Sequence, residues 1–372
     1  MWRSFFTHDY TSLSQSKAGR NTQWIVSNKR TKLLALLSLP IAALLSITVV
    51  YRHQLDTPPP EPEAIPNIKR PSYLPVQNDK AEEKFAYVAF LSKTLSTDND
   101  KWDAEDYFVA VRTLVWQLRH DPETKAAPEI DVVIMVGPGV SEGHRERLRR
   151  DGAIVKPVEH VHGKDDEWIV PKTSRWADVM DKLRAWELVE YSKVIVLDGD
   201  ILLHKPLDGA FTDPGAQLMT TKPNKGHKDD EPDLPEQYLL SAIMDFNPGA
   251  KHDYPPTDRG RRSGHFNAGF FLLRPDKKLF QYFVGLLSLK GRFNPGFPEQ
   301  NLLNYAFRWD GAMPFNELSP MWNTNFPTKY DLEKGCASVH MKWWKVEDRP
   351  MMRFALSKRW QMEGFWVERE NS

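Results

Sequence analysis

Hydrophobic and polar positions along residues 85–197 form two kinds of pattern that alternate along the chain, which predicts strands separated by helices. Short runs that are apolar almost throughout are typical of strands buried on both faces. Between these runs, apolar residues recur every three or four positions, the spacing of one helix face. The predicted strands are Phe85–Leu91, Ile130–Val136, Ala153–Val158 and Val194–Leu197. The predicted helices are Asp103–His120, one that starts near Ser141, and Trp176–Glu190.

This repeated order of strand and helix predicts an α/β fold with a parallel or mostly parallel sheet. Ligands of such sheets bind beyond the carboxyl ends of the strands. The first residues beyond the fourth predicted strand are Asp198, Gly199 and Asp200. We therefore expect the functional site at this edge of the sheet.

A separate apolar segment, residues 33–51, has no charged residue and, unlike a core helix, no polar face. About 19 residues at about 1.5 Å of rise each approach the roughly 30 Å hydrocarbon thickness of a bilayer, which predicts a transmembrane helix. A cleaved signal peptide fits less well, because about 32 residues precede the segment and no small-x-small site follows it. Basic residues outnumber acidic ones in residues 1–32, so the positive-inside rule predicts a cytosolic tail and a single-pass, type II signal anchor.

The segment after the predicted anchor is rich in proline, with seven prolines between Pro58 and Pro75. This density favours an extended stem, which we assign to residues 52–83. We expect one folded domain at residues 84–346 and a helical extension at 347–372. The predicted orientation places this domain in the lumen of the secretory pathway, and we expect it in the Golgi.

Charge and cysteine content exclude several classes of protein. Lys+Arg and Asp+Glu both number 50, so the net charge gives no reason to expect a nucleic-acid partner. The single cysteine, Cys336, excludes an internal disulfide framework and a Cys-rich zinc site. We expect it to be a small buried apolar residue.

The Asp198-Gly199-Asp200 sequence suits a hard or borderline divalent cation. Two carboxylates one residue apart can reach one ion, Gly199 permits close backbone approach, and oxygen ligands favour Mn²⁺ or Mg²⁺. Such an ion could hold a nucleotide diphosphate and offset the charge that develops on a leaving group. Solvated turns carry the same sequence, but the apolar run immediately before it favours the functional interpretation.

Four blocks of the chain resemble glycosyltransferase family 8, the glycogenin-like and galactinol-synthase-like enzymes. The blocks are DKLRAWELVEYSKVIVLDGDILLHKPLD (Asp181–Asp208), HFNAGFFLLRP (His265–Pro275), GFPEQNLLNYAF (Gly296–Phe307) and ASVHMKWWK (Ala337–Lys345). The resemblance spans residues 85–345. It implies a GT-A fold with a Rossmann-like sheet, and retaining transfer of a sugar from a UDP-sugar donor to an acceptor hydroxyl.

The resemblance implies that His340 is the third Mn²⁺ ligand beside Asp198 and Asp200. An imidazole with two carboxylates leaves positions for diphosphate oxygens; from its apolar surroundings alone, His340 would be a core histidine. Lys342 and Lys345 would neutralise phosphate charge as flexible cations. The alternative for these two lysines is a solvated basic turn.

In the same way, the resemblance implies that Lys182 contacts the donor near the sugar, although an ordinary exposed helix lysine is the alternative. Asn267 and Gly269 interrupt an apolar strand. Glycine in a strand often marks the close approach of a ligand, and asparagine can hydrogen-bond sugar hydroxyls. A plain bulge is the alternative for this pair.

Glu299 and Gln300 stand where relatives commonly carry Asp-Gln, with the acid beneath the sugar. The extra methylene of Glu299 changes the depth that its carboxylate can reach, and Gln300 would hydrogen-bond the sugar. With Asn267, they are the candidate catalytic residues. Tyr107 is the counterpart of a tyrosine that stacks on uracil, with Leu91 lining the base. A core or surface tyrosine is the alternative.

Two segments fall outside the resemblance. Residues 222–264 are long and charged, which favours an acceptor-facing lid, and Leu239–Phe246 within them predicts a short helix. Residues 351–368 predict a helix packed back on the domain, and a helix lying on the membrane is the alternative. The expected partners are a UDP-sugar donor, a glycan, glycoprotein or small polyol acceptor, and the membrane.

Two other functions are compatible with these residues. A haloacid-dehalogenase-like phosphatase also carries a strand followed by Asp-x-Asp, but on its first strand, whereas three strands precede this one. A catalytically degenerate, membrane-tethered carbohydrate-binding or scaffold protein is the other alternative. The intact Asp198, Asp200 and His340 favour the enzyme.

Overall fold

The computed structural model describes residues 83–93, 106–245, 264–345 and 348–372, all of which belong to one compact unit, Tyr73–Ser372. The predicted cytosolic tail, membrane segment and nearly all of the stem lie outside the described residues. Within the described ranges, no helix has both the length and the apolar character that a membrane span requires. The boundaries of the predicted regions therefore stay predictions.

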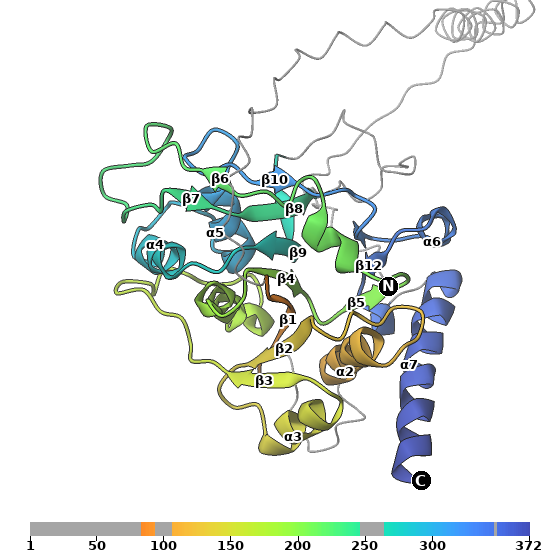
Figure 1. Ribbon diagram of the computed structural model, residues 1–372. Coiled ribbons are helices and arrows are strands. Elements are labelled where there is room, and N and C mark those ends of the chain that lie inside the picture. The colour runs from red at the N-terminus through yellow and green to blue at the C-terminus, as the bar shows by residue number, and fades with distance from the viewer. Residues whose placement is uncertain (1–82, 94–105, 246–263, 346–347) are drawn as a thin grey trace, which may run out of the picture. The chain divides into compact units, whose positions relative to one another are not determined.

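A mostly parallel sheet forms the centre of this unit (Figure 1). Within the described residues it has seven strands in the order β10-β8-β9-β4-β1-β2-β3, and only β9 runs antiparallel to its neighbours. The sheet confirms the predicted α/β class. The strands are β1 (Phe85–Leu91), β2 (Asp131–Val136), β3 (Ile154–Pro157), β4 (Lys193–Leu197), β8 (Leu240–Met244), β9 (Phe266–Leu273) and β10 (Asn316–Glu317).

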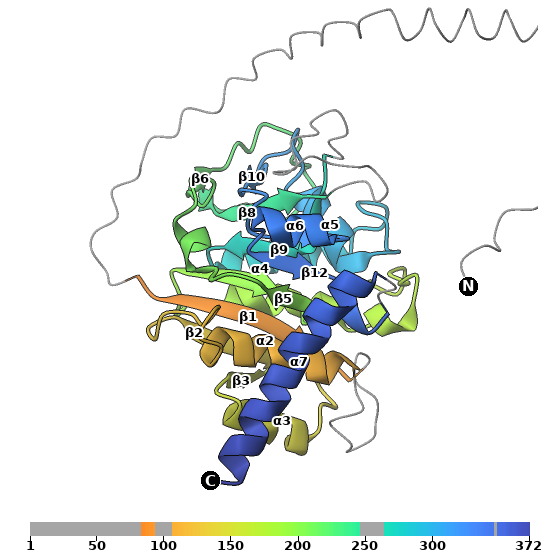
Figure 2. The ribbon, with the colours of Figure 1, turned by 90° about the vertical axis from the view of Figure 1, so that its right-hand side faces the viewer.

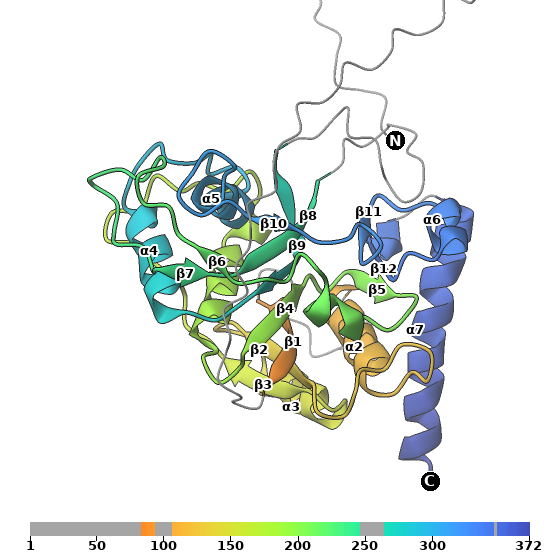
Figure 3. The same cartoon turned by 45° about the horizontal axis from the view of Figure 1, so that its top comes forward.

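Helices cover both faces of this sheet, which explains the nearly continuous apolar strands. The α-helices are α2 (Asp106–Arg119), α3 (Glu142–Arg150), α4 (Lys277–Leu287), α5 (Pro298–Ala306), α6 (Lys329–Lys334) and α7 (Arg349–Glu370). Alternate residues of β1 enter two separate apolar clusters: Val88 packs on the side of α4 and α5, and Ala89 on the side of α2. Figure 3 shows these two groups of helices on either side of the strands.

The predicted helix over Trp176–Glu190 is present but wound more tightly than an α-helix. It consists of two 3-10 helices, η2 (Ser174–Trp176) and η3 (Val179–Glu187). Two adjacent polar residues of η3, Asp181 and Lys182, are buried and bound to partners outside it. We attribute the tighter winding to these two fixed contacts, since 3-10 segments often occur where a helix is constrained.

The predicted helix at Leu239–Phe246 is wrong, because residues 240–244 form strand β8. This strand pairs antiparallel with β9 and parallel with β10. Four of its five residues are buried. A short apolar run of this kind is compatible with either element, and pairing with β9 decides for the strand.

A small second sheet brings the histidine block back to the acidic pair. It contains β5 (Ile201–Leu203), β12 (Ser338–His340) and β11 (Thr324–Asn325). β12 pairs antiparallel with β5, which places His340 opposite Ile201. Two further short strands, β6 (Met219–Thr220) and β7 (Gln237–Tyr238), pair with each other.

Helix α7 packs back on the domain along α2, as predicted (Figure 2). Its inward face buries Met351, Ala355, Lys358 and Met362. The Lys358 ammonium lies 2.9 Å from a carboxylate oxygen of buried Asp121 and 2.6 Å from one of Glu123. Apolar packing and one buried ion pair therefore hold the C-terminal helix in place.

Replacing Lys358 with Met is expected to lower the free energy of unfolding by about 3–5 kcal/mol, because the Asp121 carboxylate would stay buried without its cation. Urea denaturation followed by circular dichroism measures the change. Lys329→Met is the matched control: it removes an exposed pair with Glu333 and should change the free energy of unfolding far less, because exposed ion pairs contribute little to stability. Equal effects of the two substitutions would contradict a role of the buried pair.

Candidate active site

The acidic pair lies where β4 ends, at the carboxyl edge that the sequence predicts. The Asp198 amide donates to Gly269 O of β9 at 2.8 Å, and the Ile201 amide donates to Asp198 O at 3.1 Å. Gly199 lies against α2, since a Cβ there would come within 2.6 Å of the Val111 side chain. Close helix packing therefore requires glycine between the two acids.

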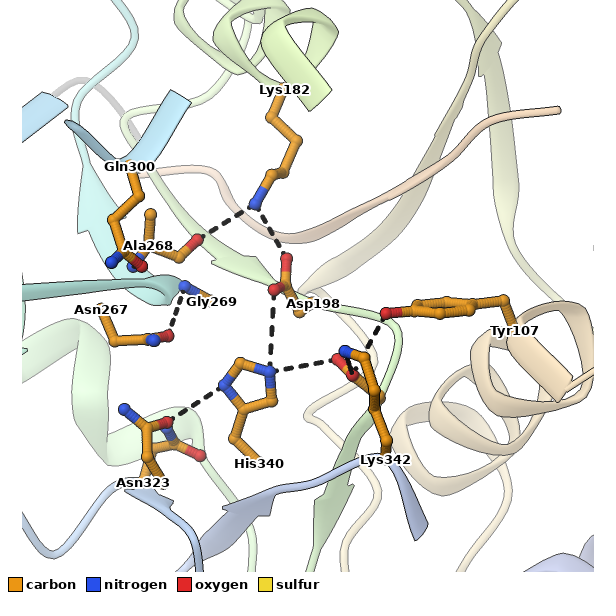
Figure 4. Close-up of polar contacts among 12 residues, drawn as sticks. Tyr107, Lys182, Asp198, Asn267, Ala268, Gly269, Gln300, Asn323, His340 and Lys342 are labelled. Atoms are coloured by element: carbon orange, nitrogen blue, oxygen red, sulfur yellow. Dashed lines mark hydrogen bonds and ion pairs between the residues drawn. The ribbon is translucent and has the colours of Figure 1, made fainter. Parts of the chain in front are cut away.

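His340 completes a cluster of three candidate metal ligands (Figure 4). Its Nε2 lies 3.1 Å from Asp200 Oδ1 and 3.7 Å from Asp198 Oδ2. One ligand atom from each of the three residues lies within 4.8 Å of the others. The structure thus brings together all three residues that the sequence predicts as ligands.

Asn325 orients the imidazole from the other side. Its Oδ1 lies 3.1 Å from His340 Nδ1, and β11 pairs with β12 so that the two residues are opposite each other. With a proton on Nδ1, the ring donates to the amide oxygen and presents the Nε2 lone pair to the carboxylates. Ligating histidines commonly have such a partner on the second nitrogen.

Gly269 makes room for this imidazole. A Cβ at position 269 would lie 2.3 Å from His340 Cε1 and 2.7 Å from Nδ1. The sequence predicts that glycine here marks a close approach to a ligand. In the structure the group that approaches is the His340 ring itself.

Charges around Asp200 are strongly coupled. Burial opposes the carboxylate, but His340 and Lys342 outweigh burial and hold the pKa of Asp200 well below its usual range. Lys342 Nζ lies 2.9 Å from Asp200 Oδ2. Burial also opposes a charged imidazole, yet Asp200 and Asp198 raise the pKa of His340. The site is thus built to favour an anionic Asp200 next to cations.

Lys182 links Asp198 to the helix that carries Glu299. Its ammonium lies 2.9 Å from Asp198 Oδ1, 3.2 Å from Ala268 O and 3.1 Å from Glu299 Oε1. Burial disfavours its charge, but the two carboxylates outweigh burial and raise the pKa of Lys182. This lysine is buried, so the interpretation as an ordinary exposed helix lysine is wrong.

Glu299 is a buried acid poised near neutrality. Burial raises its pKa to about 7, with a further contribution from the nearby Asp198 charge and an opposing one from Lys182. Its carboxylate can therefore exist in both protonation states at the pH of a cell. A group of this kind at a site edge is a candidate for proton or charge chemistry.

Asn267 and Gln300 both bind the backbone of β9. Asn267 Oδ1 accepts from the Gly269 amide at 2.8 Å, and Gln300 Oε1 accepts from the Ala268 amide at 3.1 Å. Asn304 of α5 adds two bonds to Phe266. The contacts of Gln300 and Asn304 fix α5 against the strand that faces the acidic pair, and the Asn267 bond lies within that strand.

Tyr107 lies on the opposite side of the cluster, at the start of α2. Its hydroxyl lies 3.3 Å from Asp200 Oδ2, and its ring meets Trp344 edge-on with centroids 5.0 Å apart. Burial and the Asp200 charge raise its pKa to about 12. Leu91 ends β1 and is fully buried. Stacking of Tyr107 on a base, and lining of that base by Leu91, stay predictions.

The sequence predicts no role for two groups of the site, and the side chain of one predicted residue lies outside the described part of the chain. Asn325 belongs to a segment without a helix or strand period, and Trp344 lies in the block Ala337–Lys345 without a role predicted for its ring. Only the pairing of β11 with β12 and the ring contact reveal them. Lys345 ends the 3-10 turn Trp343–Lys345, and its side chain lies outside the described part of the chain.

The three-residue cluster fits a divalent cation. Two carboxylates and an imidazole are a donor set for Mn²⁺, and an imidazole held at Nδ1 is the arrangement usual for a metal-bound histidine. The Lys342 ammonium, next to Asp200, would attract the oxygens of a phosphate. The arrangement can therefore bind a metal and a polyanion together.

Asn325→Ala should weaken Mn²⁺ binding about 10- to 100-fold, because the imidazole loses the partner that fixes its ring. Isothermal titration of the purified protein with Mn²⁺ measures the dissociation constant. Asn371→Ala, an exposed change at the end of α7, is the control. Unchanged affinity in Asn325→Ala would show that the amide does not act through the histidine.

Glu299→Gln should flatten the pH dependence of stability in metal-free buffer. Because the folded state raises the pKa of Glu299 from 4.5 to about 7, the folded state binds more protons than the unfolded state between these values. The contribution of Glu299 to stability is therefore fully present below pH 4.5 and is lost as the pH rises through about 7. Urea denaturation from pH 5 to 8 compares wild type with Glu299→Gln, and Glu368→Gln at an exposed site serves as control. Parallel curves for wild type and Glu299→Gln would contradict the expectation.

Comparison with known proteins identifies a matching family and several relatives. The model of the family described as "Glycosyl transferase family 8" matches residues 103–343. An uncharacterized protein of Schizosaccharomyces pombe is 30% identical over 325 residues, which cover 77% of each chain. Galactinol synthase 2 of Arabidopsis thaliana is 30% identical over 249 residues, covering 65% of this chain and 66% of the relative.

Among solved structures, the galactosyltransferase LgtC in complex with donor and acceptor sugar analogs is similar at 16% identity and a TM-score of 0.42. The match covers 73% of this chain and 95% of that one. Mouse xyloside xylosyltransferase 1 is similar at 12% identity and a TM-score of 0.41, covering 69% of this chain and 97% of that chain.

Proposed function

Since the chain belongs to glycosyl transferase family 8 and is a glycosyltransferase, we propose that it moves a sugar from a UDP-sugar to an acceptor hydroxyl, with Mn²⁺ and with retention at the anomeric carbon. The observation that carries this proposal is the convergence of Asp198, Asp200 and His340, whose ligand atoms lie within 4.8 Å of one another. The acceptor would be a glycan, a glycoprotein or a small polyol.

The roles of the residues follow from their contacts. Asp198, Asp200 and His340 would hold Mn²⁺, which when bound supplies positive charge to the diphosphate of the donor and stabilises it as a leaving group. Lys342, now 2.9 Å from Asp200, is close enough to turn toward a phosphate oxygen. Tyr107 and Trp344 form the wall on which a base could lie.

The sugar would lie between the acidic pair and the N-terminal part of α5. Lys182 and Glu299 form a buried ion pair at 3.1 Å there, which would orient sugar hydroxyls by hydrogen bonds. Gln300 is adjacent and would do the same. Lys182 holds the carboxylates of Asp198 and Glu299 in place without a ligand. The site would therefore need little rearrangement to orient the donor.

The GT-A arrangement and the place in the cell are also proposals. The position of the acidic pair at the end of a central strand, with the antiparallel β9 beside it, supports a GT-A domain. The apolar segment at residues 33–51 and the basic residues before it support a type II anchor. With that orientation, the domain would lie in the lumen, and we propose the Golgi.

Screening donors for hydrolysis tests the proposed activity. The purified protein is incubated with UDP-glucose, UDP-galactose, UDP-xylose and UDP-N-acetylglucosamine, with Mn²⁺ or with EDTA, and UDP release is measured. We expect release from at least one donor with Mn²⁺ and none with EDTA. Hydrolysis of p-nitrophenyl phosphate alone would favour a phosphatase, and sugar binding without any turnover would favour a degenerate binding protein.

A further inference from the structure

An aromatic pair lies beside the candidate site and has no part in the chemistry described above. Phe297 exposes 44% of its surface although it is a large apolar residue. The ring of Trp176 lies against it, with centroids 4.8 Å apart and planes tilted by 39°. Trp176 is half-buried and ends the 3-10 helix Ser174–Trp176. A single exposed apolar residue is ordinary, but two adjoining aromatic rings next to a candidate site form an apolar surface that can bind a ligand.

The pair is continuous with the residues that would hold the donor. Phe297 is the N-cap residue of α5, two positions before Glu299, which lies 3.1 Å from Lys182. The backbone of the two segments is joined directly, since the Lys172 amide donates to Gly296 O at 3.0 Å. The aromatic pair is therefore adjacent along the chain to Glu299, which forms the buried ion pair with Lys182.

Residues 172–176 also reach the opposite wall of the site. The Arg175 guanidinium lies 5.2 Å from the centroid of the Tyr107 ring, and the Tyr107 hydroxyl lies 3.3 Å from Asp200. One short segment therefore contacts both the base-side wall and the α5 side. Phe297 is 44% exposed, whereas Glu299, two positions further along the chain, is only 4% exposed.

We propose that Trp176 and Phe297 form a subsite that binds a pyranose ring of the sugar acceptor; this rests on the function proposed above. The face of an aromatic ring carries partial negative charge, and one face of a pyranose presents C–H bonds of partial positive charge. Stacking buries both faces and leaves the hydroxyl groups at the rim of the sugar. Lys172, whose ammonium lies 5.8 Å from the Phe297 centroid, is placed to donate to such hydroxyls.

The size of the surface favours a sugar over a protein partner. A stable protein interface buries about 800 Å² on each side, far more than two side chains offer. A six-membered ring matches two aromatic side chains in extent. Exposure favours the acceptor over the donor, because Phe297 is open to solvent whereas Lys182 and Glu299, which would hold the donor sugar, are buried.

The test separates transfer from hydrolysis in the full chain. Trp176→Ala and Phe297→Ala are compared with wild type for UDP release without acceptor and for transfer to a panel of methyl pyranosides of glucose, galactose, mannose and xylose configuration. Trp176→Phe retains an aromatic face. Trp360→Ala, which removes a tryptophan that is 63% exposed on α7, is the matched control.

We expect wild type to glycosylate at least one methyl pyranoside. Each alanine variant should raise the KM for that acceptor at least tenfold, with hydrolysis and the donor KM within twofold of wild type. Trp176→Phe should keep the KM for the acceptor close to the wild-type value, because it retains an aromatic face. Trp360→Ala should behave as wild type. The bound pyranoside should show upfield ring-current shifts of its C–H protons by NMR, which Trp176→Ala abolishes. Because Phe297 is exposed, Phe297→Ala keeps the test valid if Trp176→Ala folds poorly.

Two results would overturn the subsite and leave the proposed function intact. One is donor hydrolysis with no transfer to any methyl pyranoside, including the case in which only a cyclic polyol such as inositol accepts. The other is transfer with an unchanged acceptor KM in both alanine variants. If no donor is hydrolysed and no acceptor is glycosylated by wild type, the proposed function fails, and the subsite fails with it.

Discussion

Asp200→Asn is expected to reduce kcat/KM for the UDP-sugar by about 10³-fold or more and to abolish the response to Mn²⁺. The amide keeps the shape of the side chain but lacks the negative charge that the metal site requires, and loss of one group that stabilises developing charge typically costs about 10²–10³-fold. The fold should survive. Asp200 is 1% exposed, and removing its charge removes a desolvation cost. The Asn oxygen can still accept from Lys342.

The measurement is UDP release as a function of Mn²⁺ concentration, together with thermal unfolding. Asp310→Asn is the matched control, since the Asp310 side chain is 89% exposed and pairs only with Arg308 among the interactions described. It should retain full activity. Metal-dependent turnover by Asp200→Asn at the wild-type rate would remove Asp200 from the ligand set.

Gly269→Ala is expected to lower kcat/KM by about 10²-fold without a change in the donor-binding residues themselves. The new Cβ would lie 2.3 Å from His340 Cε1 and 2.8 Å from Asn267 Oδ1, so the imidazole and the amide must both shift. A displacement of about 1 Å at a reacting centre can cost about 10²-fold. Titration with Mn²⁺ should show weaker binding in parallel with the loss of activity.

Two controls distinguish displacement of His340 from general damage. Gly364→Ala on α7 adds a methyl group that meets no heavy atom within 4 Å, and it should leave activity unchanged and stabilise the helix by about 1 kcal/mol. The double variant Gly269→Ala, His340→Ala should be no less active than His340→Ala alone, because the two changes act through one group. Additive losses would show that Gly269 serves something other than the imidazole.

The sequence predicts the central architecture because the apolar pattern is unambiguous there. The apolar runs 85–91 and 194–197 are too short for helices and are buried on both faces, so their assignment as strands is correct. At residues 240–244 a short apolar run within a charged segment predicts a helix, but the structure has a strand there. Over nine residues, the pattern also does not distinguish a 3-10 helix such as Val179–Glu187 from an α-helix.

Only part of the candidate site can be predicted from the sequence, because its residues come from segments that are far apart along the chain. The acidic pair follows its strand directly, so local pattern finds it. His340 lies 140 residues beyond Asp200, and only the family resemblance points to it. Asn325 and the Trp176–Phe297 pair depend on contacts between segments far apart in the sequence. No periodic signal marks them, because their position is set by strand pairing and loop packing.

The same separation has a consequence for biosynthesis. At a translation rate of about 5–20 residues per second, the ribosome adds His340 roughly 7–28 s after Asp200. During that interval the nascent chain holds both acids but lacks the imidazole and the lysine two positions beyond it. With the metal centre proposed above, catalytic competence would arise late in synthesis. A messenger truncated upstream of the β12 codons would yield a product that lacks His340, however well the central sheet had formed.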